Sequence, residues 1–289
     1  MSKILELKNV TVNRKKSILS DISLSIKKGE KVAILGPNGC GKTTLINVAL
    51  GLIRPTKGTV QKITDILAPY QVGVHLQEQK YNGLMTVREL LDLLLFSGSY
   101  SELIEKYNLF PILDKRLSTL SGGEKQKVYL TAVFENNPEV FVLDEFTTSL
   151  DLDNQEYTVG YLKEGIAENK TIILVTHHFQ EAELLCDRLI FLKDGRIIED
   201  GLISDLYEKY SVKSRILVKV VSKNTELLNI PGVEVIDSHF LVFEFETDNE
   251  KLKILNLLNS HSNNIVSYEI IPPTIKKLYK IIYSIKEDD

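Results

Sequence analysis

A stretch near the N-terminus has the residue types and spacing that bind a polyphosphate. It matches the pattern G-x-x-x-x-G-K-[ST], in which successive backbone N–H groups curl round phosphate oxygens. Lys42 would add a positive charge for the outer phosphates, and the Thr43 hydroxyl is a magnesium ligand in this pattern. The glycines permit the backbone angles and the close approach that the loop needs. The predicted phosphate-binding residues are Gly36, Pro37, Asn38, Gly39, Cys40, Gly41, Lys42, Thr43 and Thr44.

The sequence on either side of this loop is that of a strand and a helix, which the pattern requires. Residues 31–35 form a short apolar run typical of a buried strand, and residues 44–50 predict a helix that ends at Gly51. That helix would point its N-terminus at the bound anion. Cys40 is interpreted as a small residue that fills space in the loop. The alternative is a reactive thiol, because N–H groups and Lys42 would lower its pKa.

Acidic and imidazole side chains follow two further apolar runs, residues 140–143 and 171–175. The carboxyl ends of parallel strands share one crevice, so these side chains should face the phosphate loop. There Asp144 would hold Mg²⁺ through water, and Glu145 would polarise an attacking water. His177 would contact the γ-phosphate as a neutral imidazole beside Glu145. A satisfied core histidine is the alternative interpretation, and the adjacent His178 competes for the same role.

Strands and helices alternate over residues 30–187, which predicts a parallel sheet and an α/β fold. Residues 3–26 alternate apolar and polar side chains and predict an antiparallel pair of strands. We predict a nucleotide-binding domain over residues 1–203, with an antiparallel β subdomain, a parallel-sheet core and a helical subdomain at about 80–135. The other expected elements are a turn at 54–58, a strand at 72–76, helices at 86–110, 121–135 and 154–168, a helix around 181–185 and a hairpin at 189–199.

The character of the sequence changes after residue 203. The expected elements are strands at 215–221, 233–236, 240–245 and 265–271, and helices at 225–229, at 248–258 and after Thr274. Their order, β-α-β-β-α-β, is that of the ferredoxin-like motif. We therefore predict a C-terminal α+β accessory domain over residues 204–289. No cluster of side chains in it indicates a site, so a structural contribution and ligand sensing both remain open.

The composition limits the classes of partner. Among 289 residues the net charge is −4, which argues against a nucleic-acid-binding surface because such surfaces usually carry a basic excess. The two cysteines, Cys40 and Cys186, are far apart and have no metal-ligand spacing, so we expect a reducing compartment. The apolar runs are much shorter than the ~20 residues that span a bilayer. Any membrane role is therefore expected to come through a partner.

Over residues 3–203 the sequence resembles the ATP-binding cassette (ABC) ATPases, and the order of six elements carries the resemblance. Besides the phosphate loop and Asp144-Glu145, residues 120–124 resemble the LSGGQ signature and residues 149–151 the D-loop. Gln77 and His177 stand where the family has its Q-loop glutamine and switch histidine. The resemblance implies an ABC-type P-loop fold that binds ATP and Mg²⁺. It implies nucleotide contacts at Gln77, Ser121, Gly122, Gly123 and Asp151, metal contacts at Thr43, Gln77 and Asp144, and catalytic roles for Glu145 and His177.

The resemblance also implies a head-to-tail homodimer with two ATP molecules between the copies. Ser121, Gly122 and Gly123 offer a hydroxyl and a helix N-terminus to the phosphates of the other copy. Taken alone, Ser121 and Glu124 form a capping box that starts a helix, and both roles can coexist.

The sequence departs from the family pattern at several positions. Phe146 replaces a usual proline, Glu124 a common glutamine, and Thr148-Ser149 the usual Ser-Gly. The aromatic side chain that stacks on adenine is missing near Arg14, whose guanidinium could stack instead. Tyr70 and Tyr81, further along the chain, are the aromatic residues considered for stacking on the base, with a place in the core as the alternative.

Three stretches narrow the resemblance to ATPase subunits of ABC-2-type drug, lantibiotic and lipid or glycan exporters: residues 74–78, 84–90 and 145–151. That class implies a separate multi-span membrane permease, contacted by residues 80–120, and no nucleic-acid partner. It also implies a cytoplasmic protein, peripheral on the inner face of the cell membrane. The alternatives are a non-transport ABC ATPase of the DNA-repair type and a regulatory member of the mechanotransmission type. The interval between Gln77 and Ser121 has no heptad run, which disfavours the DNA-repair type.

Overall fold

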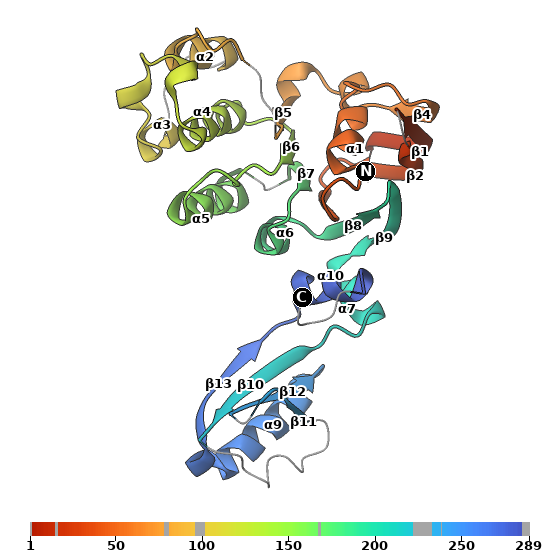
Figure 1. Cartoon of the computed structure of the whole chain (residues 1–289), viewed down its shortest axis with the longest axis vertical. Coiled ribbons are helices and arrows are strands. Elements are labelled where there is room, and N and C mark those ends of the chain that lie inside the picture. The colour runs from red at the N-terminus through yellow and green to blue at the C-terminus, as the bar shows by residue number, and fades with distance from the viewer. Residues whose placement is uncertain are drawn as a thin grey trace. The chain divides into compact units, whose positions relative to one another are not determined.

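A computed structural model describes residues 2–14, 17–77, 81–95, 102–166, 169–221, 233–237 and 239–284. The chain divides into two compact units, Met1–Leu202 and Ile203–Asp289. Both are drawn in Figure 1. Across the described residues, every helix is too short or too polar to cross a bilayer.

The first unit is built on a six-stranded sheet in the order β5-β6-β7-β3-β8-β9. Its first five strands are parallel, as predicted from the alternation of strands and helices, and β9 runs antiparallel to β8 at one edge. β6 and β7 are buried along their whole length, which explains their continuous apolar sequences. The strands are β3 (Lys31–Leu35), β5 (Val72–His75), β6 (Val140–Asp144), β7 (Thr171–Val175), β8 (Arg188–Lys193) and β9 (Arg196–Leu202).

A second, antiparallel sheet has the order β2-β1-β4. The predicted pair is confirmed as β1 (Lys3–Asn13) and β2 (Ser17–Lys27). The third strand, β4 (Lys57–Gln61), was not predicted, and it begins within the residues that the sequence assigned to a turn. Its residues are mostly exposed, so no apolar alternation revealed it. The buried faces of both sheets and of α1 (Lys42–Ala49) share one hydrophobic core.

The remaining helices of this unit lie on the other side of the six-stranded sheet from β1 and β2 in Figure 1. The prediction that residues 86–110 form a helix was wrong. α2 ends at Leu94, Leu95 is extended, and residues 96–101 lie outside the described part. α4 packs on β6 through Phe134 and Phe141, whose ring centroids are 5.9 Å apart. These helices are α2 (Val87–Leu94), α3 (Glu102–Lys106), α4 (Gly122–Glu135), α5 (Leu152–Gly160), its π-helical continuation Tyr161–Ile166, and α6 (Phe179–Leu185).

The second unit contains a four-stranded sheet in the order β11-β12-β10-β13, in which every neighbouring pair is antiparallel. One face of the sheet packs on α9 through Ile216, Phe243 and Leu258. The predicted helix at 225–229 lies outside the described residues, so the ferredoxin-like assignment stays a prediction. Thr274 caps the last helix as predicted, whereas α7 was not predicted. The elements are α7 (Ile203–Lys209), β10 (Ser214–Val220), β11 (Val233–Val235), β12 (Phe240–Phe245), α9 (Asp248–Ser260), β13 (Ile265–Ile271) and α10 (Ile275–Ile282).

Candidate functional site

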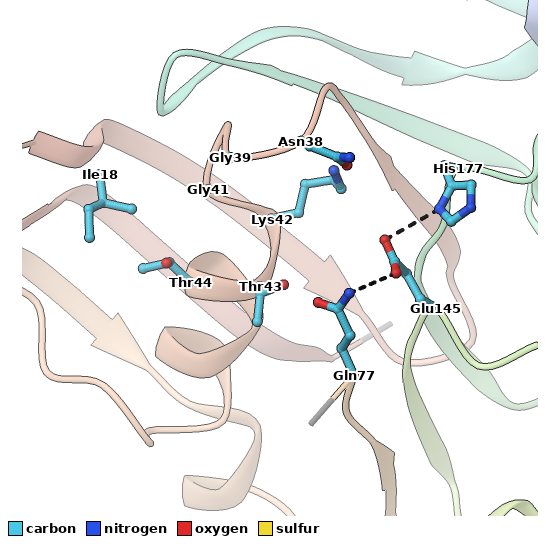
Figure 2. A pocket seen from close by; sticks show the side chains of 10 residues that line it. All are labelled: Ile18, Asn38, Gly39, Gly41, Lys42, Thr43, Thr44, Gln77, Glu145 and His177. Atoms are coloured by element: carbon cyan, nitrogen blue, oxygen red, sulfur yellow. Dashed lines mark hydrogen bonds and ion pairs between the residues drawn. The ribbon is translucent and has the colours of Figure 1, made fainter. Parts of the chain in front are cut away.

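A cleft of about 550 Å³ opens where the phosphate loop faces the carboxyl ends of three parallel strands. The loop between β3 and α1 forms one wall, and the residues that follow β5, β6 and β7 form the other (Figure 2). The cleft therefore brings together side chains that are far apart in the sequence, including Lys42, Gln77, Glu145 and His177. Its lining residues are Ile18, Asn38, Gly39, Gly41, Lys42, Thr43, Thr44, Gln77, Glu145 and His177.

The phosphate loop has the backbone shape that an anion cradle needs. Gly41 lies at φ +111° immediately before α1, a conformation that residues with a side chain rarely adopt. Lys42 is buried, and its Nζ donates to the carbonyl oxygens of Gly36 at 2.8 Å and Pro37 at 3.2 Å. The ammonium group is thus folded across its own loop, and phosphate oxygens would be stronger acceptors for it than these neutral carbonyls.

Cys40 fills space inside the loop. Its side chain is buried, and a Cβ on Gly36 would lie 2.7 Å from its sulfur. Burial raises the pKa of the Cys40 thiol, although Lys42 partly opposes this. Since only the thiolate is a good nucleophile, the structure supports the space-filling interpretation and not the reactive thiol.

Asp144 lies behind the cleft lining, hydrogen-bonded to Thr43, which does line the cleft. Thr43 Oγ1 donates to Asp144 Oδ2 at 3.0 Å. Burial raises the pKa of Asp144 to about 6, with the Thr43 hydrogen bond opposing the rise and the neighbouring Glu145 adding to it. A buried carboxylate beside a second carboxylate is a favourable place for a cation. The hydroxyl of Thr43, the carboxylate of Asp144 and the amide carbonyl of Gln77 are the hard oxygen donors that Mg²⁺ prefers, so these residues fit that ion.

Glu145 lies between the ends of β5 and β7. Gln77 Nε2 donates to its Oε2 at 2.9 Å, and His177 Nδ1 lies 3.3 Å from its Oε1 (Figure 2). The backbone of Glu145 has φ +50°, and its N–H donates to the carbonyl of Val175 at 2.8 Å. This turn aims the carboxylate at the phosphate loop. A carboxylate held there, beside an imidazole, can accept a proton from a water in the cleft.

His177 and His178 line different hollows. The side chain of His177 lines the cleft, whereas His178 lines a separate hollow on α5 and α6. The two ring centroids are 4.4 Å apart. Of the two histidines that the sequence left in competition, the structure therefore places His177 beside Glu145.

Ser121, Gly122, Gly123 and Asp151 lie elsewhere. Among the described residues that line the cleft, none of these four is present. Ser121 forms the capping box of α4: its Oγ accepts from the Glu124 N–H at 3.2 Å, and its own N–H donates to Glu124 Oε2 at 2.8 Å. Asp151 caps α5 by accepting from the Asn154 N–H at 3.0 Å. Ser121 and Asp151 therefore cap the starts of α4 and α5 in this chain.

The loop that carries Asp151 packs closely on the start of α4. A Cβ on Gly123 would lie 3.0 Å from the carbonyl oxygen of Ser149. Lys127 Nζ of α4 is 3.8 Å from Asp151 Oδ2. The predicted signature residues Ser121–Gly123 and the predicted D-loop residue Asp151 are therefore adjacent in the fold.

Phe146 stands where related sequences usually have proline. It is fully buried, and its ring centroid lies 6.5 Å from that of Phe134 on α4. Gln126 of α4 also donates to its carbonyl oxygen. The departure thus joins the loop after β6 to α4, and Glu145 still lines the cleft.

Ile18 and the residues that the sequence singled out for stacking on the base line three different hollows. Ile18 of β2 lines the cleft, and its alternating strand sequence gave no signal of this. Arg14 lines a neighbouring hollow of about 490 Å³ that shares Thr43 and Gln77 with the cleft. Tyr70 and Tyr81 line a different hollow, of about 230 Å³.

Comparisons with known proteins agree with this geometry. A protein-family model described as "ABC transporter" matches residues 19–148. The chain is 36% identical over 210 residues to Nod factor export ATP-binding protein I of Burkholderia orbicola (strain AU 1054). The aligned region covers 67% of this chain and 68% of that protein. The chain is 35% identical over 212 residues to the protein of the same name from Bradyrhizobium diazoefficiens, covering 68% and 69%.

Two solved structures are similar in fold and sequence. One is an ATP-binding subunit of an ABC transporter, with a TM-score of 0.62 and 26% identity, covering 72% of this chain and 93% of that one. The other is a dimeric ATP-binding cassette in a post-hydrolysis state with ADP and Pi bound. It has a TM-score of 0.59 and 30% identity, covering 69% of this chain and 98% of that one.

Proposed function

Since the chain belongs to the ATPases of the ABC transporter family, we propose that it works as a head-to-tail homodimer that drives a separate membrane permease of an exporter. The chain is an ATP-binding and ATP-hydrolysing subunit of that family. The observation that carries the mechanism is the position of Glu145, held between Gln77 and His177 across the cleft from Lys42. The proposal takes export as the direction of transport from the relatives named for export.

Within one copy, the residues of the cleft divide the chemistry among them. Lys42 and the backbone N–H groups of the loop bind the outer phosphates. Thr43, Gln77 and Asp144 hold Mg²⁺, which neutralises charge on the phosphate oxygens when it is bound. Glu145 accepts a proton from the attacking water, and His177 keeps that carboxylate and the γ-phosphate aligned. Proton transfer of this kind typically contributes about 10²–10⁴-fold to a rate.

The second copy completes each site. Ser121, Gly122 and Gly123 stand at the N-terminus of α4, where N–H groups favour an anion, and they do not line the cleft of their own chain. Dimeric cassettes among the similar solved structures support this arrangement. ATP would then lie between the loop of one copy and α4 of the other, so that ATP binding favours the dimer and hydrolysis releases it.

The membrane partner is proposed to contact the helical part of the first unit. A hollow lined by Tyr70, Tyr81 and Tyr129 lies where β5 meets α4, and the rings of Tyr81 and Tyr129 are 5.2 Å apart. β5 leads directly to Gln77, so a partner seated there would be connected to the cleft by a short segment. A permease in this position places the chain on the inner face of the cell membrane. The net charge of −4 argues against a nucleic-acid partner.

The test is Glu145→Gln in the full chain. The amide keeps the size and shape of the side chain and cannot accept the proton, so we expect turnover to fall by about 10²-fold or more. ATP-dependent dimerisation, measured by size-exclusion chromatography, should persist because phosphate binding is intact. The control is Glu208→Gln, an exposed carboxylate of the second unit, which should keep normal turnover. Normal turnover in the Glu145 variant would overturn the role of this residue.

The transport function has a separate test. The chain should co-purify with a multi-span membrane protein from detergent extracts, and the pair should move a solute outward in vesicles when ATP is supplied. ATPase activity of the pair without any solute flux would favour the regulatory alternative instead.

A further inference from the structure

A buried carboxylate on α6 has no part in the mechanism above. Glu181 of α6 is only 6% exposed. Thr147 Oγ1 donates to one of its carboxylate oxygens, and Thr176 Oγ1 donates to the other at 2.6 Å. Both threonines are themselves buried. Among the described residues Glu181 forms no ion pair, so these two hydroxyl groups are what stabilise its charge.

The two hydroxyl donors come from the two loops that carry the proposed catalytic pair. Thr147 follows Glu145 by two residues on the loop after β6, and Thr176 immediately precedes His177 on the loop after β7. Thr176 Oγ1 also accepts from the N–H of His178 at 2.9 Å. Glu181 is therefore joined through Thr176 to the backbone on both sides of His177.

The two loops are thus linked twice. The first link is the contact of 3.3 Å between Glu145 and His177 inside the cleft, where half of the His177 side chain is exposed. The second link, through Glu181, is buried. Charge-assisted hydrogen bonds in a buried, low-dielectric setting are stronger than exposed ones, so the buried link sets the spacing of the loops.

The backbone of Glu145 also needs such support. Its φ of +50° is a conformation that a non-glycine residue keeps only when its surroundings hold it. The N–H of Glu145 donates to Val175, directly before Thr176, and the Thr147 hydroxyl fixes the loop two residues further on. Both restraints tie this turn to the end of β7.

We propose that Glu181 is a positioning residue for ATP hydrolysis. Through Thr147 and Thr176 it holds the carboxylate of Glu145 and the imidazole of His177 at the spacing that lets them act together on the γ-phosphate and its attacking water. This inference rests on the proposed function, because it takes Glu145 and His177 as the groups that act. A displacement of about 1 Å in such a pair is enough to reduce a rate by about 10²-fold.

The experiment replaces each threonine by valine and by serine in the full chain, and measures ATP turnover. Valine keeps the shape and removes the hydroxyl group, whereas serine keeps the hydroxyl group. We expect the Thr147→Val and Thr176→Val variants to lose roughly tenfold or more in kcat while KM for ATP stays within about threefold, because binding by the phosphate loop is untouched. The two serine variants should restore kcat to within about threefold of the parent chain.

Two further variants make the result specific to the buried network. Glu181→Gln removes the charge at constant shape and should also lower kcat more than it changes KM. Glu183→Gln removes an exposed carboxylate from the same helix and should leave kcat unchanged. Valine variants with normal kcat, or with KM raised as much as kcat falls, would refute the proposal. If Glu145→Gln is inactive while the valine variants are normal, only the positioning role fails; if Glu145→Gln is active, the proposed function itself fails.

Discussion

Replacing His75 should stabilise the protein, because this histidine is buried without a hydrogen-bonding partner. It is the last residue of β5, two positions before Gln77, and only 2% of it is exposed. Within the described residues neither of its ring nitrogens has a partner at hydrogen-bond geometry, and the nearby backbone of Asp144 offsets the effect of burial only in part. An unsatisfied buried polar group costs about 1–3 kcal/mol of stability. His75→Leu removes that cost at similar volume, so we expect the free energy of unfolding at pH 7.5 to rise by about 1–3 kcal/mol.

The same substitution should change how stability depends on pH. Burial lowers the pKa of His75 from 6.5 to about 4. In the unfolded chain the ring takes up a proton near pH 6.5, whereas in the folded chain it stays neutral until about pH 4. The free energy of unfolding therefore decreases as the pH falls from 6.5 to 4, and is insensitive to this group above pH 6.5. The pKa difference sets a ceiling of about 3 kcal/mol on this loss.

The assay is urea unfolding followed by circular dichroism at several pH values between 4 and 8, since the chain has no tryptophan for fluorescence. His75→Leu should show a smaller loss of stability below pH 6.5 than the parent chain. His239→Gln, an exposed histidine of the second unit, is the control and should keep the parent profile. Equal stability of parent and His75→Leu at pH 7.5, together with equal slopes below pH 6.5, would refute the reasoning.

Two other substitutions test the site through stability. Asp144→Asn should stabilise the nucleotide-free, metal-free chain at pH 8. Burial raises the pKa of Asp144 from 3.8 to about 6, so the free energy of unfolding of the parent chain decreases as the pH rises from 3.8 to 6, by up to about 3 kcal/mol, and stays at that lower value above pH 6. Thermal unfolding in a chelator measures this, and a lower melting temperature in the variant would contradict it. Gly123→Ala places a Cβ 3.0 Å from Ser149 O, whereas a Cβ on Gly122 meets nothing within 4 Å. We expect Gly123→Ala to be less stable than the matched Gly122→Ala by about 1–2 kcal/mol, and equal melting temperatures would contradict the close packing.

The sequence predicted those parts of the fold whose residues carry a local signal. β3, β6 and β7 have continuous apolar sequences because both faces of the parallel sheet are covered. Ser121 and Thr274 predicted the starts of their helices because the first backbone N–H groups of a helix need a side-chain acceptor. By contrast, β4 is short and mostly exposed, and it forms only because β1 offers an open edge. The prediction of a helix over residues 86–110 was wrong because the spacing of apolar residues gives no sign that the backbone becomes extended at Leu95.

The site divides in the same way. Lys42, Glu145 and His177 follow parallel strands, so a rule about parallel sheets was enough to expect them in one cleft. Ile18 and Glu181 were not singled out, because their positions depend on which element packs against which. Ile18 reaches the cleft since β2 passes beside Gly41, whose added Cβ would lie 3.0 Å from the Ile18 carbonyl. In the sequence Glu181 is an ordinary acidic residue in the first turn of a helix. Its bonds to Thr147 and Thr176 become visible only when α6 is packed against the loops after β6 and β7.

The arrangement of hydrogen bonds in a single copy explains why a second copy should matter for turnover. The Lys42 ammonium group is occupied by carbonyl oxygens of its own loop, and both oxygens of Glu145 are engaged by Gln77 and His177. Under the proposed function a nucleotide would offer Lys42 better acceptors than these carbonyls. The groups expected to enclose the γ-phosphate, at Ser121–Gly123, instead lie outside that cleft. Water would therefore remain free to screen the charges around Glu145 until α4 of another copy covers the phosphates, and only then do the electrostatic interactions of the site gain their full strength.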